Sequence, residues 1–222
     1  MPIPSPARIL LKLQKQGVGP SLQYAVHRLH NEYWERKLGI RTAGGYLLAS
    51  EGVVDKDDHD YSPESYLDFE RAMKWLSSEE LRGVFLDCGS GKGRIVLRAA
   101  CYPFRRAIGV ELSPKLTAIA ADNLERARKR LTCRDVQLIT LDATRYEFPA
   151  DLTCLFLYNP FGGAVLDTVL GNLRRSLESA PRAFALIVST PDRVERALAG
   201  ATWIRKVDEW HGLRRHVLYR TP

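Results

Sequence analysis

A glycine-rich turn directly after a buried strand limits the possible folds of this chain more than any other segment. The apolar run Val84–Asp87 predicts a strand that stops at an acid. Three glycines follow at alternate positions, Gly89, Gly91 and Gly93, and then a helical pattern begins. Glycine allows positive φ angles and lets a ligand approach the backbone closely. Such a strand–turn–helix unit is typical of a site for a nucleotide-like ligand at the carboxyl edge of a parallel sheet.

The rest of the C-terminal part continues to alternate between strand and helix patterns. We predict five β–α units, which imply a parallel sheet covered by helices on both faces. Two last strands, predicted at Thr202–Val207 and Arg215–Tyr219, have no helix between them and imply an antiparallel hairpin at one edge. The expected fold class is α/β, a Rossmann-like doubly wound sheet of seven strands, mostly parallel, with an antiparallel last strand. The other predicted strands are Val84–Asp87, Ala107–Leu112, Val136–Leu141, Leu152–Tyr158 and Ala183–Ser189.

The N-terminal part of the chain is expected to form a helical extension. Apolar residues from Leu22 to Tyr33 recur at spacings of three and four, which predicts a helix. We therefore divide the chain into residues 1–60, a helical extension with an acidic loop, and residues 61–222, the sheet domain. The basic start of the extension leaves three interpretations open. It is a helix packed on the domain, an amphipathic helix in peripheral contact with an anionic membrane, or an organelle transit peptide.

Composition and charge exclude several classes of protein. Of the 222 residues, 45% are hydrophobic and 27% are charged, which is ordinary for a globular protein and excludes a disordered or fibrous chain. No apolar run reaches the ~18 residues of a membrane span, so we expect no transmembrane segment. The net charge is +7, and residues 1–41 hold seven Lys or Arg against two acids, while residues 203–222 hold five against two. Nucleic-acid binders usually gather such charge in one patch, so nucleic acid is a possible but not the favoured partner.

The cysteines and histidines show no spacing typical of a metal site. None of the four cysteines form a C-x-x-C pair, and no histidine pair accompanies them, so we expect no metal. We interpret the cysteines as reduced thiols of a cytoplasmic protein. For the five histidines we expect surface or packing roles.

Three acids stand at the ends of the first three predicted strands and indicate the kind of ligand. Asp87 would repel a pyrophosphate, Lys92 lacks the Ser or Thr that must follow it in an ATP loop, and Arg94 occupies a position that is small in dinucleotide sites. Asp87 instead suits a ligand with an amino group. Glu111 could accept both hydrogens of a ribose diol, and Asp142 could accept from an adenine amino group.

These residues resemble the class I, seven-strand S-adenosylmethionine-dependent methyltransferases. The resemblance covers about residues 61–222 and rests on Asp87–Arg94, Glu111, Leu141–Ala143 and Tyr158–Gly162. It implies S-adenosylmethionine as the cofactor, with its methionine part at the glycine turn. The residues that it assigns to the cofactor are Asp87, Gly89, Ser90, Gly91, Gly93, Glu111, Leu112, Asp142, Ala143 and Asn159.

The chain is also distantly similar to the non-SET lysine methyltransferases. Those enzymes place a tyrosine-bearing segment before the first strand over the cofactor. The segment Tyr61–Tyr66 stands at that place in this chain. The similarity therefore adds Tyr61 and Ser65 to the expected cofactor contacts.

The segment after the fourth predicted strand is the expected reaction centre. Tyr158–Phe161 resembles the Asn/Asp-Pro-Pro-Tyr/Phe motif of methyltransferases that modify amino or amide nitrogen, with Phe161 where the second proline would stand. We assign Asn159, Pro160 and Phe161 to catalysis. The Asn159 side chain and the Pro160 carbonyl would position an amine, and Phe161 would stack on the acceptor.

The expected function is methylation of a protein lysine or another amino group. Three alternatives stay open: an O-methyltransferase of a small metabolite, a nucleic-acid methyltransferase, and a cofactor-binding module without catalysis. The sequence leaves the acceptor, the number of methyl groups transferred and the oligomeric state undetermined.

Overall fold

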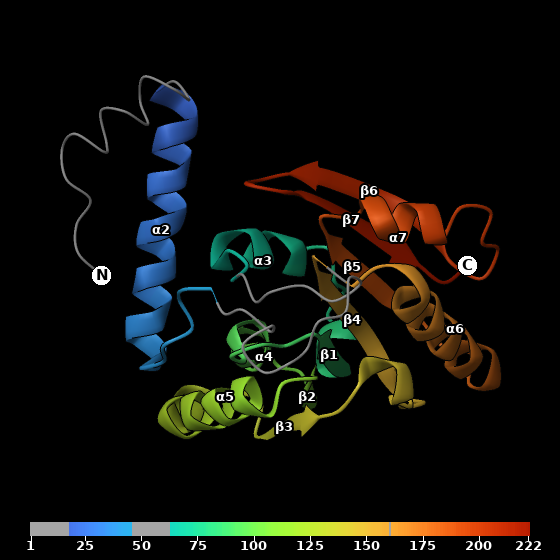
Figure 1. The fold of residues 1–222 in the computed structure, drawn as a ribbon, viewed down its shortest axis with the longest axis horizontal. Coiled ribbons are helices and arrows are strands. Elements are labelled where there is room, and N and C mark those ends of the chain that lie inside the picture. Colours follow the sequence, from blue (N-terminus) through green and yellow to red (C-terminus); the bar gives the residue numbers. More distant parts are fainter. Residues whose placement is uncertain (1–17, 46–62, 160) are drawn as a thin grey trace.

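The computed structural model describes residues 18–45, 63–159 and 161–222, and these residues contain one seven-stranded sheet (Figure 1). The strand order is β3-β2-β1-β4-β5-β7-β6. Strands β1 to β5 are parallel, and β7 runs antiparallel to both β5 and β6. The strands are β1 Val84–Cys88, β2 Arg106–Glu111, β3 Asp135–Thr140, β4 Leu152–Tyr158, β5 Ala185–Ser189, β6 Arg205–His211 and β7 Arg215–Arg220. The predicted fold class is therefore confirmed.

Helices cover both faces of this sheet, as the apolar strands require. The α3, α4 and α5 helices pack on one face, and α6 and α7 pack on the other. Alternate residues of β1 serve the two cores: Leu86 contacts the α6 side and Phe85 the α3 side. The helices are α2 Val18–Leu38, α3 Tyr66–Met73, α4 Arg94–Ala99, α5 Pro114–Ala127, α6 Gly163–Ser179 and α7 Asp192–Ala197.

The direction in which successive strands are added to the sheet changes between β1 and β4, and this position indicates where a ligand can bind. After β1 the chain adds β2 and β3 on one side, and then returns to add β4 on the other side. In open parallel sheets the crevice at such a switch point, at the carboxyl ends of the strands, is the usual ligand site. The glycine-rich turn after β1 lies at this edge.

One predicted strand was placed wrongly. We expected Thr202–Val207, whereas β6 spans Arg205–His211. This strand is at the sheet edge, and nearly all of its residues are exposed. It includes the charged residues Lys206, Asp208 and Glu209, which pair with β7. An edge strand of this kind lacks the apolar run by which buried strands are predicted.

The α2 helix confirms the predicted N-terminal helix, but its apolar residues are placed unexpectedly. Leu22, Val26 and Leu29 are 63%, 48% and 64% exposed among the described residues. The end of the helix is buried instead, where Leu38 and Ile40 join the core under α4 and α5. None of the helices in the described part of the chain is long and apolar enough to cross a membrane.

Candidate cofactor and acceptor site

The turn between β1 and α4 is held against the end of β2. The amides of Gly89 and Ser90 both donate to the carbonyl of Val110, at 2.8 and 3.0 Å. Gly89 has a φ of 87°, and a Cβ added there would meet no atom of the described residues within 4 Å. The backbone at Gly89 is therefore open to a ligand. The Ser90 hydroxyl lies in the space that a side chain at Gly109 of β2 would fill.

Gly93 has a packing role, unlike Gly89. It also has a positive φ, 78°, but it is buried, and a Cβ there would lie 3.1 Å from the Cβ of Ala120. The missing side chain allows α5 to approach the start of α4. The structure thus places the expected cofactor contact Gly93 in the packing between helices, and places Gly89 at the open surface.

The Glu111 carboxylate joins the turns that follow β1 and β2. Its Oε2 accepts from the Gly91 amide at 2.7 Å, and its Oε1 accepts from the Ser113 amide at 2.9 Å. The residue is only 7% exposed. Each carboxylate oxygen has a second lone pair, so Glu111 can hold the glycine turn and still accept from a hydroxyl of a ligand. Leu112, the next residue along the chain, is half-buried.

Asp87 is a buried acid at the end of β1. It is 3% exposed, and burial raises its pKa to about 8, with further contributions from the carboxylates of Glu111 and Glu64. The side chain is therefore largely protonated at neutral pH. A cationic group at this position would favour the ionised form and lower the pKa again. An acid whose pKa is strongly shifted, in a crevice where ligands bind, often belongs to a functional site.

Asp142 follows β3 and begins a short 3₁₀ helix, Ala143–Arg145. Its Oδ1 accepts from the amide and from the hydroxyl of Thr144, at 2.8 and 2.7 Å. These bonds fix the direction of the carboxylate, which is partly exposed. Ala143 packs against the main core.

The structure brings the three strand-end acids together around one residue. Burial raises the pKa of the Cys88 thiol, and Asp87, Glu111 and Asp142 raise it further. All three carboxylates are therefore close enough to act electrostatically on the same side chain. β1, β2 and β3 are neighbouring parallel strands, so the acids at their carboxyl ends lie on one edge of the sheet, and their contact with a cofactor stays a prediction.

The ends of β4 and β5 carry two unusual backbone conformations. Asn159 has a φ of 43° and Thr190 a φ of 57°, in the left-handed region. Such angles are tolerable for asparagine but strained for a β-branched threonine. The Asn159 amide donates to the carbonyl of Ser189 at 3.1 Å, which ties the two strand ends together, and Asn159 itself is exposed. Strained exposed turns of this kind cluster at functional sites.

Two of the expected site residues, Phe161 and Ser65, make contacts within the protein itself. Phe161 is half-buried and packs against the main core, so its ring contacts the protein interior. The Ser65 hydroxyl lies 2.7 Å from Nδ1 of His27 in α2, and it is engaged there. Tyr61 and Pro160 lie outside the described residues, and their assignments stay predictions.

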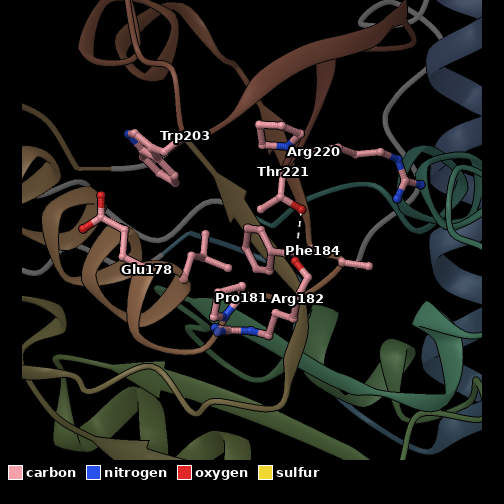
Figure 2. A pocket seen from close by; sticks show the side chains of 10 residues that line it. Glu178, Pro181, Arg182, Phe184, Trp203, Arg220 and Thr221 are labelled. Atoms are coloured by element: carbon pink, nitrogen blue, oxygen red, sulfur yellow. Dashed lines mark hydrogen bonds between the residues drawn. The ribbon is translucent and has the colours of Figure 1, made fainter.

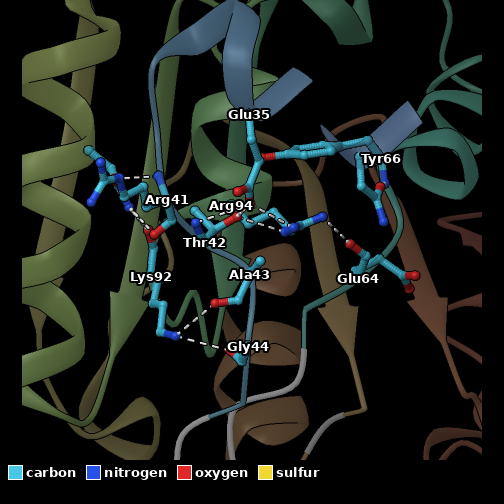
Figure 3. A network of polar contacts seen from close by, with 11 residues as sticks. Glu35, Arg41, Thr42, Ala43, Gly44, Glu64, Tyr66, Lys92 and Arg94 are labelled. Atoms are coloured by element: carbon cyan, nitrogen blue, oxygen red, sulfur yellow. Dashed lines mark hydrogen bonds and ion pairs between the residues drawn. The ribbon is translucent and has the colours of Figure 1, made fainter. Parts of the chain in front are cut away.

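The N-terminal extension is attached to the glycine turn through Arg94 (Figure 3). The Arg94 guanidinium is buried and donates to Glu35 Oε1 at 2.8 Å, to Thr42 Oγ1 at 2.8 Å and to the Glu64 carbonyl at 3.0 Å. It also lies over the ring of Tyr66, 4.3 Å from the centroid. Because these partners come from three segments, the sequence alone gave no signal for this network.

A second contact brings the same segment directly over the turn. Lys92, inside the glycine turn, donates to the Gly44 carbonyl at 3.0 Å (Figure 3). Asn123 of α5 accepts from the Arg41 amide at 2.9 Å. Residues 41–44 thus lie beside the turn. The predicted boundary at residue 60 stays a prediction, and residues 35–44 make close contacts with the sheet domain.

A cavity of about 480 Å³ lies elsewhere in the described structure (Figure 2). It is lined by Phe184, just before β5, by Trp203, and by the end of the chain after β7. These residues stand at the amino ends of the parallel strands, at the edge opposite to the glycine turn. The cavity is therefore separate from the candidate site.

Comparison with solved structures supports this fold. No protein-family model matches the sequence, and no curated protein matches it. Among solved structures, an RNA methyltransferase from Salinibacter ruber, in complex with S-adenosyl-L-homocysteine, is 23% identical with a TM-score of 0.51. The match covers 72% of this chain and 94% of that one.

Two further structures show how widely this fold is used. The ribosomal protein L11 methylase from Lactobacillus delbrueckii subsp. bulgaricus is 16% identical, covers 70% of this chain and 75% of its own, and has a TM-score of 0.50. A precorrin 8w decarboxylase from Methanobacterium thermoautotrophicum is 18% identical, covers 73% and 92%, and has a TM-score of 0.51. The chain therefore has the class I methyltransferase fold, as the resemblance implied. Its activity has to be argued from the site.

Proposed function

We propose that the protein is an S-adenosylmethionine-dependent methyltransferase that binds the cofactor at the carboxyl ends of β1, β2 and β3. The observation that carries the proposal is that Asp87, Glu111 and Asp142 stand at the carboxyl ends of three neighbouring parallel strands, and that the turn after the first of these strands has an open backbone at Gly89. One neighbour with the same fold is described in complex with S-adenosyl-L-homocysteine, which supports this choice of cofactor.

Each acid suits one part of that cofactor. Asp87 would face the amino group of the methionine moiety, because a cation offsets the cost of ionising a buried acid. Glu111 would accept from the ribose hydroxyls while it holds the glycine turn. Asp142, oriented by Thr144, would accept from the adenine amino group. The bound cofactor supplies an electrophilic methyl group, which an acceptor lone pair displaces from sulfur.

We infer that the acceptor binds at the ends of β4 and β5 and that the reacting atom is an amino nitrogen. Asn159 presents an exposed side chain on a backbone in the left-handed conformation at this place. Its amide oxygen would accept a hydrogen of a neutral amine and direct the nitrogen lone pair, which is a positioning role. The Pro160 carbonyl is proposed to assist. A protein lysine is the favoured acceptor, and RNA and small molecules are the other outcomes of the test.

The acceptor class can be identified with labelled cofactor. We expect the protein, incubated with tritiated S-adenosylmethionine and a cell extract, to label the protein fraction at amino groups. Label in RNA or in small molecules would replace the lysine assignment. No label in any fraction, with intact cofactor binding, would favour a binding module without catalysis.

Asn159→Gly is expected to lower methyl transfer while leaving the fold intact. Glycine accepts the φ of 43° without strain, so the change removes the side chain without a backbone penalty. Loss of a positioning group costs on the order of 10²-fold in rate. The measurement is the rate of transfer into the labelled fraction, with affinity for S-adenosyl-L-homocysteine as the control. Unchanged transfer would remove Asn159 from the reaction centre.

Gly89→Ala and Gly93→Ala form a matched pair that separates binding from folding. Both positions have positive φ, so both variants pay a backbone strain of about 1–2 kcal/mol. Gly93→Ala also crowds Ala120 and should lose about 1–3 kcal/mol more. In the described part of the chain, the added methyl group of Gly89→Ala meets no atom within 4 Å, so this variant should instead weaken S-adenosyl-L-homocysteine binding. Equal losses of stability and equal binding in the two variants would contradict an open ligand site at Gly89.

A further inference from the structure

A second group of buried polar side chains lies beyond the proposed cofactor site. Glu64, just before α3, and Asp68, in the first turn of α3, meet His216, the second residue of β7. One ligand atom from each lies within 4.8 Å of the others. The three residues are 2%, 2% and 0% exposed. They come from segments about 150 residues apart, so no spacing in the sequence reveals them.

The orientation of His216 leaves one ring nitrogen directed at this group. Its Nδ1 lies 3.1 Å from the carbonyl of Arg214, an acceptor, so Nδ1 carries the hydrogen. The ring is stacked on Trp210, with centroids 4.5 Å apart and planes at 7°, which fixes its plane. The Nε2 atom therefore faces Glu64 Oε2 at 3.5 Å. A histidine that binds a metal through one ring nitrogen usually donates a hydrogen bond from the other nitrogen, often to a backbone carbonyl.

The carboxylates of Glu64 and Asp68 are oriented by hydrogen bonds from backbone amides. Glu64 Oε1 accepts from the Ser65 amide at 2.7 Å, and Asp68 Oδ2 accepts from the Leu213 amide at 3.1 Å. Each acid thus keeps one oxygen for another partner. Glu64 Oε2 and His216 Nε2 have no hydrogen-bond partner among the described residues. Two atoms bound to one Zn²⁺ at about 2.1 Å in tetrahedral geometry lie about 3.4 Å apart, close to their separation here.

Among the described residues, no lysine or arginine pairs with the carboxylates of this group. Within the described part of the chain, the ion pairs of Glu64 and Asp68 are with histidines only, His216 and His27. Arg94 is near, but it donates to the Glu64 carbonyl and not to its carboxylate. Buried charges are normally paired or bound to a metal.

We propose that Glu64, Asp68 and His216 form a binding site for one divalent transition-metal ion of the Zn²⁺ class. Two carboxylates and one imidazole suit Zn²⁺ better than Mg²⁺, which prefers oxygen ligands and retained water. The site lies beside Ser189 at the end of β5, which is paired with His216 and bonded to Asn159. The ion would hold α3 to the terminal hairpin next to the proposed acceptor position.

Binding of Zn²⁺ alone to the chelator-treated full-length protein tests the proposal. We expect one Zn²⁺ per chain by titration calorimetry, with Mg²⁺ binding much more weakly. Bound Co²⁺ should show visible absorption bands of a histidine- and carboxylate-coordinated ion. The folded wild type failing to bind Zn²⁺ or Co²⁺ would overturn the proposal, and this outcome needs no variant.

Matched variants then locate the site. Glu64→Gln and His216→Gln should each lower Zn²⁺ affinity by at least the ~10–100-fold typical of outer partners of a metal site. Glu70→Gln is the control, because Glu70 is also on α3 and also meets a histidine, His30, at 3.0 Å. Equal Zn²⁺ affinity in all three variants would refute this location. Circular dichroism checks that each variant is folded. If the Glu64 or the His216 variant does not fold, the Co²⁺ spectrum of the wild type tests the proposal instead.

The metal site and the proposed function fail independently. S-adenosyl-L-homocysteine binding is measured on the same samples. Cofactor binding without Zn²⁺ binding would remove the metal site alone. Zn²⁺ binding without cofactor binding would remove the proposed function alone.

Discussion

Replacing Asp87 by asparagine is expected to stabilise the protein and to abolish binding of the cofactor. The native pKa of Asp87 is about 8, whereas an unfolded aspartate titrates near 3.9. Between these values the folded state binds a proton that the unfolded state has released. The free energy of unfolding therefore falls as pH rises from about 4 to 8, by up to about 1.4 kcal/mol per pH unit.

Asparagine imitates the neutral acid and removes this pH-dependent loss. We expect Asp87→Asn to gain up to about 5 kcal/mol at pH 7.5, from about 1.4 kcal/mol for each pH unit above 3.9, and to have a flatter stability profile than the wild type. The same change removes the carboxylate that would face the methionine amino group, so S-adenosyl-L-homocysteine affinity should fall by at least ~100-fold, as for a charge-assisted hydrogen bond. Urea unfolding at several pH values and titration calorimetry measure the two effects.

Asp122→Asn is the matched control for this change. Asp122 lies exposed on α5, so its substitution should alter neither the stability profile nor cofactor binding. A loss of stability in Asp87→Asn at pH 7.5, or cofactor affinity equal to that of the control, would contradict the role given to Asp87.

Replacing Arg94 by methionine is expected to cause the largest loss of stability. The change leaves Glu35, Thr42 and the Glu64 carbonyl without their common donor. Removing one partner of a buried charge pair costs about 3–5 kcal/mol, because the other charge stays buried and uncompensated. The variant should also weaken cofactor binding, since Arg94 attaches residues 35–44 beside the glycine turn.

Arg128→Met provides the control for Arg94→Met. Arg128 forms an ion pair with Glu125 on the surface, where both side chains are more than half exposed. Exposed pairs contribute about 0–1 kcal/mol, so this variant should unfold close to the wild type in urea. Similar losses in the two arginine variants would show that the Arg94 network does not hold the extension to the domain.

The sequence predicted the parts of the structure that follow from local pattern. The buried strands β1, β2, β4 and β5 are apolar runs, and the half-buried edge strand β3 keeps enough apolar residues to be found as well. The acids that end β1, β2 and β3 were recognised because parallel strands share one carboxyl edge. The edge strand β6 was misplaced because it is exposed and charged. Local pattern therefore located the cofactor half of the candidate site.

The remaining part depends on contacts between distant segments. Arg94 is joined to Glu35 across 59 residues, and His216 meets Glu64 from the far end of the chain. Helical spacing around Leu22 predicted the helix but not its exposed position, because spacing does not say which partner a helix face meets. Only the fold shows that a second buried acid–histidine group adjoins the strand ends where the acceptor is proposed to bind.

Titration of S-adenosyl-L-homocysteine into the wild-type protein tests the central claim most directly. The account predicts one molecule bound per chain, and binding that is lost in Asp87→Asn but kept in Asp122→Asn. A folded wild type that binds no S-adenosyl-L-homocysteine would contradict the assignment of the carboxyl edge of β1, β2 and β3 to this cofactor, and with it the proposed methyl transfer.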